Sequence, residues 1–155
     1  MEENGIERVI QKIDERLEIL VKLLDPSLID TVISKIFVLM IETFKQILLV
    51  GGKRRKFIPK HAQLFKQNLE QLKLIFVKSS PDSFGIDLES ADREIRPLLD
   101  ILKLFELDTL DLISKFDIKS RSPSNMLIGQ ILIHRKDRTA KIFWKKQKLY
   151  KRMKI

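Results

Sequence analysis

DPSLIDTVISKIFVLMIETFKQILLVGG, residues 25–52, is the stretch of sequence that decides the fold. From Leu28 to Leu48 its apolar residues recur in steps of three and four, with few interruptions by charge. The charged residues are Asp30, Lys35, Glu42 and Lys45. This spacing predicts an α-helix whose apolar face is wide enough for a central place in a helical bundle.

The ends of this helix carry their own signals. Pro26 disfavours the α conformation in the residue before it, yet it suits the first position of a new helix that Asp25 can cap. Gly51 and Gly52 follow the last apolar turn, where glycine can close a helix without a side-chain clash. The sequence therefore predicts a helix that begins at Pro26 and stops before the two glycines.

Further amphipathic helices are predicted on both sides of this one. They begin near Ile6, at Pro59, near Leu88, after Asp108, and at Ser124 or Asn125. Pro97 should kink the fourth helix or move its start, because proline removes a backbone donor. The segments SSPDSFG at 79–85 and KSRSPSN at 119–125 are typical of loops. We therefore predict an all-α, antiparallel bundle of five to six helices.

Length and composition favour one domain inside the cell. A chain of 155 residues with 44% apolar content can bury one core, so we expect a single domain over residues 1–155. The absence of cysteine excludes disulfides, thiolate metal sites and cysteine nucleophiles, and it agrees with a reducing compartment. The charged start differs from a secretory signal, and no apolar run approaches the roughly 20 residues that span a bilayer. We expect a cytoplasmic protein that is peripheral where it meets membranes.

The basic charge gathers at the C-terminal end. There are 30 Lys and Arg against 21 Asp and Glu, a formal net charge of +9. Residues 134–155 hold ten bases and one acid, Asp137, so this segment alone nets +9. The ten bases are Arg135, Lys136, Arg138, Lys141, Lys145, Lys146, Lys148, Lys151, Arg152 and Lys154. We predict a basic terminal helix or extension over 134–155 that contacts an anionic partner.

Three kinds of anionic partner fit this segment, and a fourth interpretation needs no partner. Acidic phospholipid would attract it, each base near the surface contributing on the order of 1 kcal/mol. Nucleic-acid phosphates or an acidic protein face would attract it as well. The same bases can also form nothing more than the solvated end of a helix. Phe143 and Trp144 fit packing within the bundle better than base stacking.

The run GGKRRK at 51–56 is a secondary candidate for anion contact. Its bases are Lys53, Arg54, Arg55 and Lys56. A phosphate-binding loop needs glycines spaced ahead of Lys and Ser or Thr, after a strand and before a helix. Here the glycines follow a helix, and Pro59 separates the bases from the next one. A helix-terminating loop with a basic rim is favoured, and a nuclear address is a weaker alternative.

No catalytic, metal or cofactor site is predicted. His61 and His134 are the only histidines, and neither has the spacing to a nucleophile or carboxylate that acid–base catalysis needs. DLESADRE at 87–94 lacks the glycine and the ligand spacing of a calcium loop, and its acids fit a helix start better. We expect a protein that is not an enzyme and that holds no cofactor.

Three stretches together resemble a known family. LLVGGKRRKF at 48–57 is similar to a leucine-rich helix end followed by Gly-Gly, an arginine and an aromatic residue. FKQNLEQLKLIFV at 65–77 leads to LLDILKLFELDTLDLI at 98–113, and HRKDRTAKIFWKKQ at 134–147 fits a late His-Arg, Asp, Ala and Phe pattern. The matching residues include Gly51, Gly52, Arg55, Phe57, Leu104, Phe105 and Thr109. The chain resembles the second Munc homology domain, the C-terminal part of the MUN domain of Munc-thirteen-type vesicle-priming proteins and their plant and fungal relatives.

The resemblance implies a helical bundle of the tethering-complex kind that acts in vesicle docking, priming and exocytosis by contacting SNARE proteins. It also implies further domains for which 155 residues leave no room. Together with the basic segment, it predicts a non-enzymatic scaffold that meets SNARE proteins, other trafficking proteins or acidic phospholipid. The alternative is a nucleic-acid-binding helical module that uses the same bases, and a third hypothesis is a small adaptor inside a larger complex.

Overall fold

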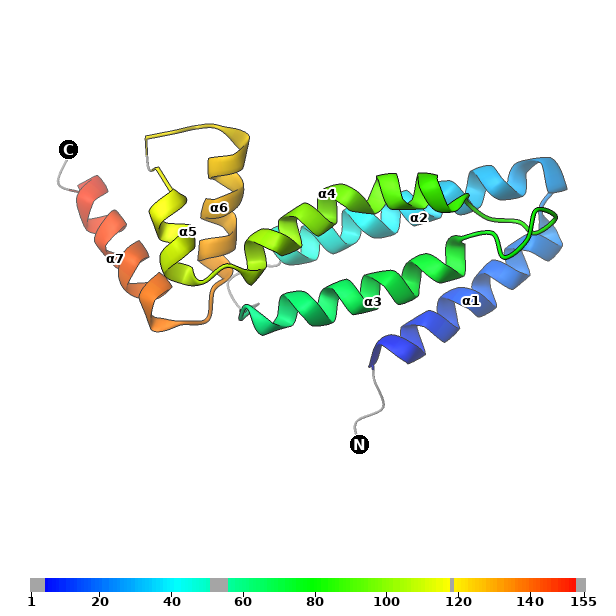
Figure 1. Cartoon of the computed structure of the whole chain (residues 1–155), viewed down its shortest axis with the longest axis horizontal. Coiled ribbons are helices and arrows are strands. Elements are labelled where there is room, and N and C mark those ends of the chain that lie inside the picture. Colours follow the sequence, from blue (N-terminus) through cyan, green and yellow to red (C-terminus); the bar gives the residue numbers. More distant parts are fainter. Residues whose placement is uncertain (1–4, 51–55, 118, 153–155) are drawn as a thin grey trace. The chain divides into compact units, whose positions relative to one another are not determined.

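The chain is all-α, as the sequence predicts. Its computed structural model describes residues 5–50, 56–117 and 119–152, with side chains over 7–50, 56–117 and 119–147. Within these ranges the helices are α1 (Gly5–Leu23), α2 (Pro26–Leu49), α3 (Lys60–Phe76), α4 (Leu88–Glu106), α5 (Thr109–Lys115), α6 (Pro123–His134) and α7 (Arg138–Arg152) (Figure 1). The described ranges thus hold seven helices, against the five to six expected, because the predicted terminal helix is divided into α6 and α7.

The helices pack as two compact units. Unit 1 comprises Met1–Thr43 and Phe65–Leu98, and unit 2 comprises Phe44–Leu64 and Leu99–Ile155. Each unit has its own buried residues and is described by itself below. The single domain expected over residues 1–155 stays a prediction.

The core of unit 1 is built on one face of α2. Ile29, Ile33, Phe37 and Ile41 are buried at intervals of four residues, which places them in one row along the helix. The other helices of the unit add buried Leu17, Leu69, Leu72, Phe76, Ala91, Ile95 and Leu98. The rings of Phe37 and Phe76 lie 5.2 Å apart, and burying one such side chain contributes about 1.5–3 kcal/mol. The apolar face predicted for this helix is therefore the core face.

The predicted junction between α1 and α2 is confirmed. Asp25 Oδ1 accepts hydrogen bonds from the Ser27 hydroxyl at 2.6 Å and from the Ser27 backbone N–H at 2.9 Å. These bonds lower the pKa of Asp25, so the cap stays ionised further into the acid range. At the other end α2 stops at Leu49. Gly51 and Gly52, the predicted stop signal, lie outside the described residues.

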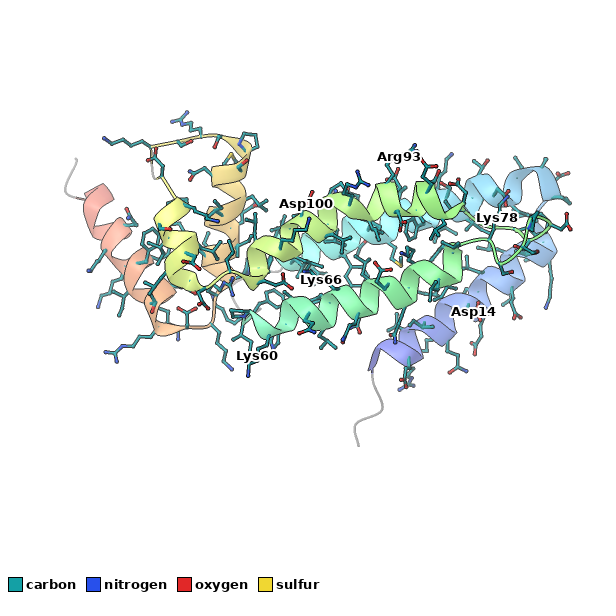
Figure 2. All side chains as sticks on the ribbon, viewed as in Figure 1. Asp14, Lys60, Lys66, Lys78, Arg93 and Asp100 are labelled. Atoms are coloured by element: carbon teal, nitrogen blue, oxygen red, sulfur yellow. The ribbon has the colours of Figure 1, made fainter. Side chains whose placement is uncertain are left out.

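The loop between α3 and α4, residues 77–87, is tied to the beginning of α2. Asp30 accepts a hydrogen bond from Lys78 Nζ at 2.6 Å and another from the Gly85 backbone N–H at 2.9 Å. Figure 2 shows Lys78 at this junction. Gly85 adopts a φ of +143°, a backbone conformation that residues other than glycine rarely adopt. The predicted loop is therefore present, and one carboxylate fixes its position.

Pro97 does not move the start of α4. The helix begins at Leu88 and continues past Pro97 to Glu106. Asp87 Oδ1 accepts a hydrogen bond from the Ser90 backbone N–H at 2.8 Å and so caps the first turn. The helix therefore starts where its apolar series starts; of the two alternatives for Pro97, the shifted start is excluded and the kink stays a prediction.

Unit 2 contains the C-terminal helices α5, α6 and α7, which pack on one another (Figure 1). Ser122 caps α6 by accepting a hydrogen bond from the Asn125 backbone N–H, and Pro123 takes the first position of the helix. The cap thus lies earlier than predicted. The chain leaves the helix after His134 and starts α7 only at Arg138. The prediction of one continuous terminal helix is therefore wrong.

Candidate functional site

Two contacts of Asp137 fix the start of α7 on unit 2. Asp137 accepts a hydrogen bond from the backbone N–H of Ala140 at 2.8 Å and one from the Thr109 hydroxyl at 2.5 Å. Burial alone would raise the pKa of Asp137, but these bonds and the charge of Arg135 lower it. The carboxylate therefore stays ionised near neutral pH, where it caps α7 and joins it to the first residue of α5.

Aromatic rings hold α7 further along. Phe116 lies 5.8 Å from Phe143 and 5.9 Å from Trp144, measured between ring centroids, in edge-to-face geometry. The Phe116 ring also lies against α6, where a Cβ added at Gly129 would come within 3.0 Å of it. Phe143 and Trp144 therefore pack within unit 2, as the sequence favours.

The opposite face of α7 is exposed and basic. Its described residues are Arg138, Lys141, Ile142, Lys145 and Lys146, which we call the α7 stripe. Their spacing of three, four, seven and eight residues from the first member places them on one side of the helix. Ile142 is 44% exposed between the charges. Four of the ten predicted bases are thus brought together on one surface.

The structure describes the side chains of only some of the remaining bases in the predicted segment. Lys136 is exposed just before α7. The side chains of Lys148, Lys151 and Arg152 lie outside the described ones, and Lys154 lies outside the described residues altogether.

Arg135 is a correction to the predicted set, because it is an interior residue. Its side chain is 1% exposed, and one guanidinium nitrogen donates to Phe105 O and to Leu107 O, both at 2.7 Å. The guanidinium carbon lies 5.9 Å from the centre of the Phe105 ring. Burial lowers the pKa of Arg135, against the opposing charges of Asp137 and Asp108. We therefore remove Arg135 from the candidate surface.

The secondary basic run contributes one described base. Lys56 Nζ donates to Ile133 O at 2.5 Å, so this lysine binds the last turn of α6. Gly51, Gly52, Lys53, Arg54 and Arg55 lie outside the described residues. Lys53, Arg54 and Arg55 therefore stay a prediction, whereas the ammonium group of Lys56 is bonded within unit 2.

The residues of the family resemblance gather around the turn between α6 and α7. The Phe57 backbone N–H donates to His134 O at 2.8 Å, and Phe57 O accepts from the Lys136 backbone N–H at 3.1 Å. The Phe57 ring lies 5.8 Å from the buried ring of Phe105. Thr109 is buried as well, and Leu104 is half-buried. These residues position α7 and do not form its exposed surface.

Asn125 is a structural residue that the sequence pattern did not reveal beyond a possible cap. Its side-chain amide donates to Asp117 O at 2.6 Å and to Ser120 O at 2.7 Å, while its oxygen accepts from the Asp117 backbone N–H at 2.8 Å. The side chain is buried and closes the loop before α6. Only the SPSN grouping marks this position, and such groupings are common in loops.

We predict that Asn125→Ala destabilises unit 2 by about 1–3 kcal/mol, because it leaves buried backbone groups without partners. Trp144 is the only tryptophan of the chain and belongs to unit 2. Urea unfolding followed by its fluorescence should therefore show a lower midpoint. Ser124→Ala, at the exposed neighbouring position, should leave the midpoint unchanged; equal effects of the two substitutions would contradict the role assigned to Asn125.

In the part of the chain that the structure describes, none of the helices is long and apolar enough to cross a membrane. The described residues form an all-helical protein with an exposed basic row on α7. The chain belongs to the family described as PATROL1-like, TPR repeats, whose model matches residues 1–130. No curated protein and no solved structure matches it. The matched region ends inside α6, so the α7 stripe lies beyond it.

Proposed function

We propose that the chain is a non-enzymatic scaffold of vesicle trafficking that contacts SNARE proteins or acidic membrane through α7. The observation that carries this proposal is the α7 stripe, an exposed basic row on a helix whose other face is held by packing. A charged surface on a fixed helix speeds encounter with an anionic partner, while apolar contact lengthens the stay. The protein would work in the cytoplasm and at membrane surfaces.

Membership of the family supports a protein-interaction role. Stacked helical repeats build extended surfaces for partner proteins, and PATROL1 is a Munc13-like protein. The resemblance of residues 48–57, 98–113 and 134–147 to the second Munc homology domain points towards the same process of vesicle docking and priming. Both observations support the proposal of a role in exocytosis.

The composition of the stripe supports contact with a headgroup layer. Four bases on one side of a helix attract an acidic surface, and Ile142 between them can enter the layer below the headgroups. The attraction should weaken in salt, because the screening length falls from about 10 Å at 0.1 M to about 3 Å at 1 M.

Flotation with vesicles that contain phosphatidylserine tests the membrane contact. The variant Lys141→Gln/Lys145→Gln/Lys146→Gln should bind on the order of 100-fold more weakly than the native chain at low salt, because each lysine contributes on the order of 1 kcal/mol. The matched control is Lys12→Gln/Lys22→Gln/Lys35→Gln, which changes the net charge equally at exposed positions of unit 1.

Three outcomes separate the hypotheses. Loss of binding in the α7 variant alone supports the proposal, and the same pair of variants should then be compared on soluble SNARE proteins. Equal loss in both variants would show that overall charge and not the stripe governs binding. Binding of the native chain to nucleic acid, with no binding to acidic vesicles or SNARE proteins, would favour the alternative of a nucleic-acid-binding module.

A further inference from the structure

The charges of the chain are divided between its two units. Unit 1 holds 15 acidic and 10 basic residues, a net charge of −5, whereas unit 2 holds 6 acidic and 20 basic residues, a net charge of +14. The overall +9 thus conceals an acidic unit beside a strongly basic one. Opposite net charges on the two units favour contact between unit 1 of one molecule and unit 2 of another.

One end of unit 1 also exposes apolar side chains. This end carries the turn from α1 to α2, the loop 77–87 and the first turn of α4 (Figure 1), and the bonds from Asp30 to Lys78 and Gly85 join the beginning of α2 to the loop. Its exposed apolar residues are Leu23, Leu28, Phe84 and Leu88. Its exposed acids are Asp25, Asp82, Asp87 and Glu89. We call these eight residues the tip surface.

Two acids of the tip surface, Asp25 and Asp87, stay ionised further into the acid range than an ordinary aspartate. Hydrogen bonds from Ser27 lower the pKa of Asp25, and hydrogen bonds from Ser90 lower that of Asp87. The bases at this end already face acids of the same unit, since Lys78 binds Asp30 and Arg93 lies 3.4 Å from Glu89. Acidic charge therefore predominates on this end.

The loop presents Phe84 from a fixed backbone. The residue is 42% exposed and directly precedes Gly85, whose N–H is bound by Asp30. Ser83 and Ser80 close the outer part of the loop, with the Ser83 hydroxyl donating to Ser80 O at 2.8 Å. An exposed aromatic side chain on a fixed loop loses little conformational entropy when a partner covers it, which is typical of residues at the centre of interfaces.

We propose that the tip surface of one molecule binds the α7 stripe of a second copy of the same chain, head to tail. The two surfaces are complementary: acids with exposed leucine and phenylalanine meet bases with an exposed isoleucine. Charge also selects the orientation, because contact of two units 2 would oppose +14 to +14. A head-to-tail contact is heterologous: it leaves one tip surface and one α7 stripe unoccupied, so further copies can add to form rings or chains.

The contact is small and polar, so it forms a weak assembly. The two surfaces comprise eight and five residues, fewer than the roughly 20–30 residues per side of a stable interface, so we expect a dissociation constant of about 10–100 μM that rises steeply with salt. This inference does not depend on the proposed trafficking role, since it concerns only surfaces of the chain itself.

Sedimentation velocity of the full chain at rising concentration tests the proposal. At low salt the sedimentation coefficient should increase up to about 100 μM, and the increase should disappear near 0.5 M salt, where screening shortens the reach of charge to about 4 Å. A chain that remains monomeric at low salt over this whole range would overturn the proposal.

Two variants and their mixture test the pairing of the surfaces. The tip variant Asp82→Ser/Phe84→Ser/Glu89→Gln spares the caps Asp25 and Asp87, and the α7 variant Lys141→Gln/Lys145→Gln/Lys146→Gln spares the packed face. Each variant alone should be monomeric. Their equimolar mixture should form complexes of two molecules and no larger ones, because each variant retains one intact surface.

The mixture also gives the outcome that contradicts the model of assembly. Self-association of either variant alone at the native level, or a mixture that remains monomeric while the native chain associates, would show that another surface is used. Circular dichroism checks that both variants are folded. The tip variant should still bind acidic vesicles as the native chain does, so failure of the trafficking proposal and failure of head-to-tail assembly are distinguishable.

Discussion

Arg135→Ala should destabilise unit 2 by about 2–4 kcal/mol, the combined effect of a cavity and of two carbonyl groups that lose their donor. The Arg135 guanidinium binds Phe105 O in the last turn of α4 and Leu107 O just after the helix, and it lies over the Phe105 ring. The side chain is the link between that helix end and the turn before α7. Its removal should therefore loosen the position of α7 on unit 2.

One opposing contribution limits the size of the effect. Two guanidinium nitrogens of Arg135, Nε and one terminal nitrogen, are buried without a hydrogen-bond partner among the residues that the structure describes. A buried cation that is only partly bonded is costly, so its removal recovers some free energy. Arg135→Met, which fills the space without the charge, should therefore destabilise unit 2 by only about 1–2 kcal/mol.

Urea unfolding followed by Trp144 fluorescence measures this prediction, because the only tryptophan of the chain lies on α7. Lys136→Ala, at the exposed neighbouring position, is the control and should leave the midpoint within error of the native value. A midpoint for Arg135→Ala equal to that of the control would contradict the structural role. A larger loss for Arg135→Met than for Arg135→Ala would show that the charge itself stabilises the unit.

The contrast between Arg135 and its neighbours shows what sequence patterns can and cannot tell. Helical spacing correctly predicts the core face of α2 and the cap at Asp25, because these depend on residues within a few positions. The sequence groups Arg135 with nine other bases only because all ten lie close together, between positions 135 and 154. The binding of Arg135 to Phe105 and Leu107 joins positions about thirty residues apart, which no local period encodes.

The division of the terminal helix follows the same logic. Residues 123–152 have enough apolar and basic helix formers for one continuous helix. Asp137 instead caps a new helix by binding the Ala140 N–H and the Thr109 hydroxyl, and Phe57 pairs with the backbone on either side of Arg135. These partners come from distant segments and outweigh a weak local preference. The four bases of the α7 stripe belong to the predicted basic segment, and their local helical spacing places them on one side of α7.

Gly85→Ala should destabilise unit 1 by about 2–4 kcal/mol, because it adds backbone strain and weakens a backbone hydrogen bond. At a φ of +143° a Cβ would lie 2.7 Å from Phe76 O and 3.1 Å from the Lys78 backbone nitrogen. Both are backbone atoms, so neither can turn away as a flexible side chain would. The same two groups bind Ile86, whose N–H donates to Phe76 O at 2.8 Å and whose carbonyl accepts from Lys78 at 3.0 Å.

Hydrogen exchange localises this effect, since unit 1 contains no tryptophan. Amides of residues 77–87 and of the first turns of α2 should exchange faster in Gly85→Ala than in the native chain. The reason is that the hydrogen bond from the backbone N–H of residue 85 to Asp30 is weakened. Ser79→Ala, at an exposed position of the same loop, should exchange as the native chain does. Unchanged exchange in Gly85→Ala would mean that the loop adapts to a side chain and that Asp30 does not fix its position. Since Phe84 directly precedes Gly85, the loosened loop should also weaken head-to-tail association without any change to the exposed side chains of the tip surface.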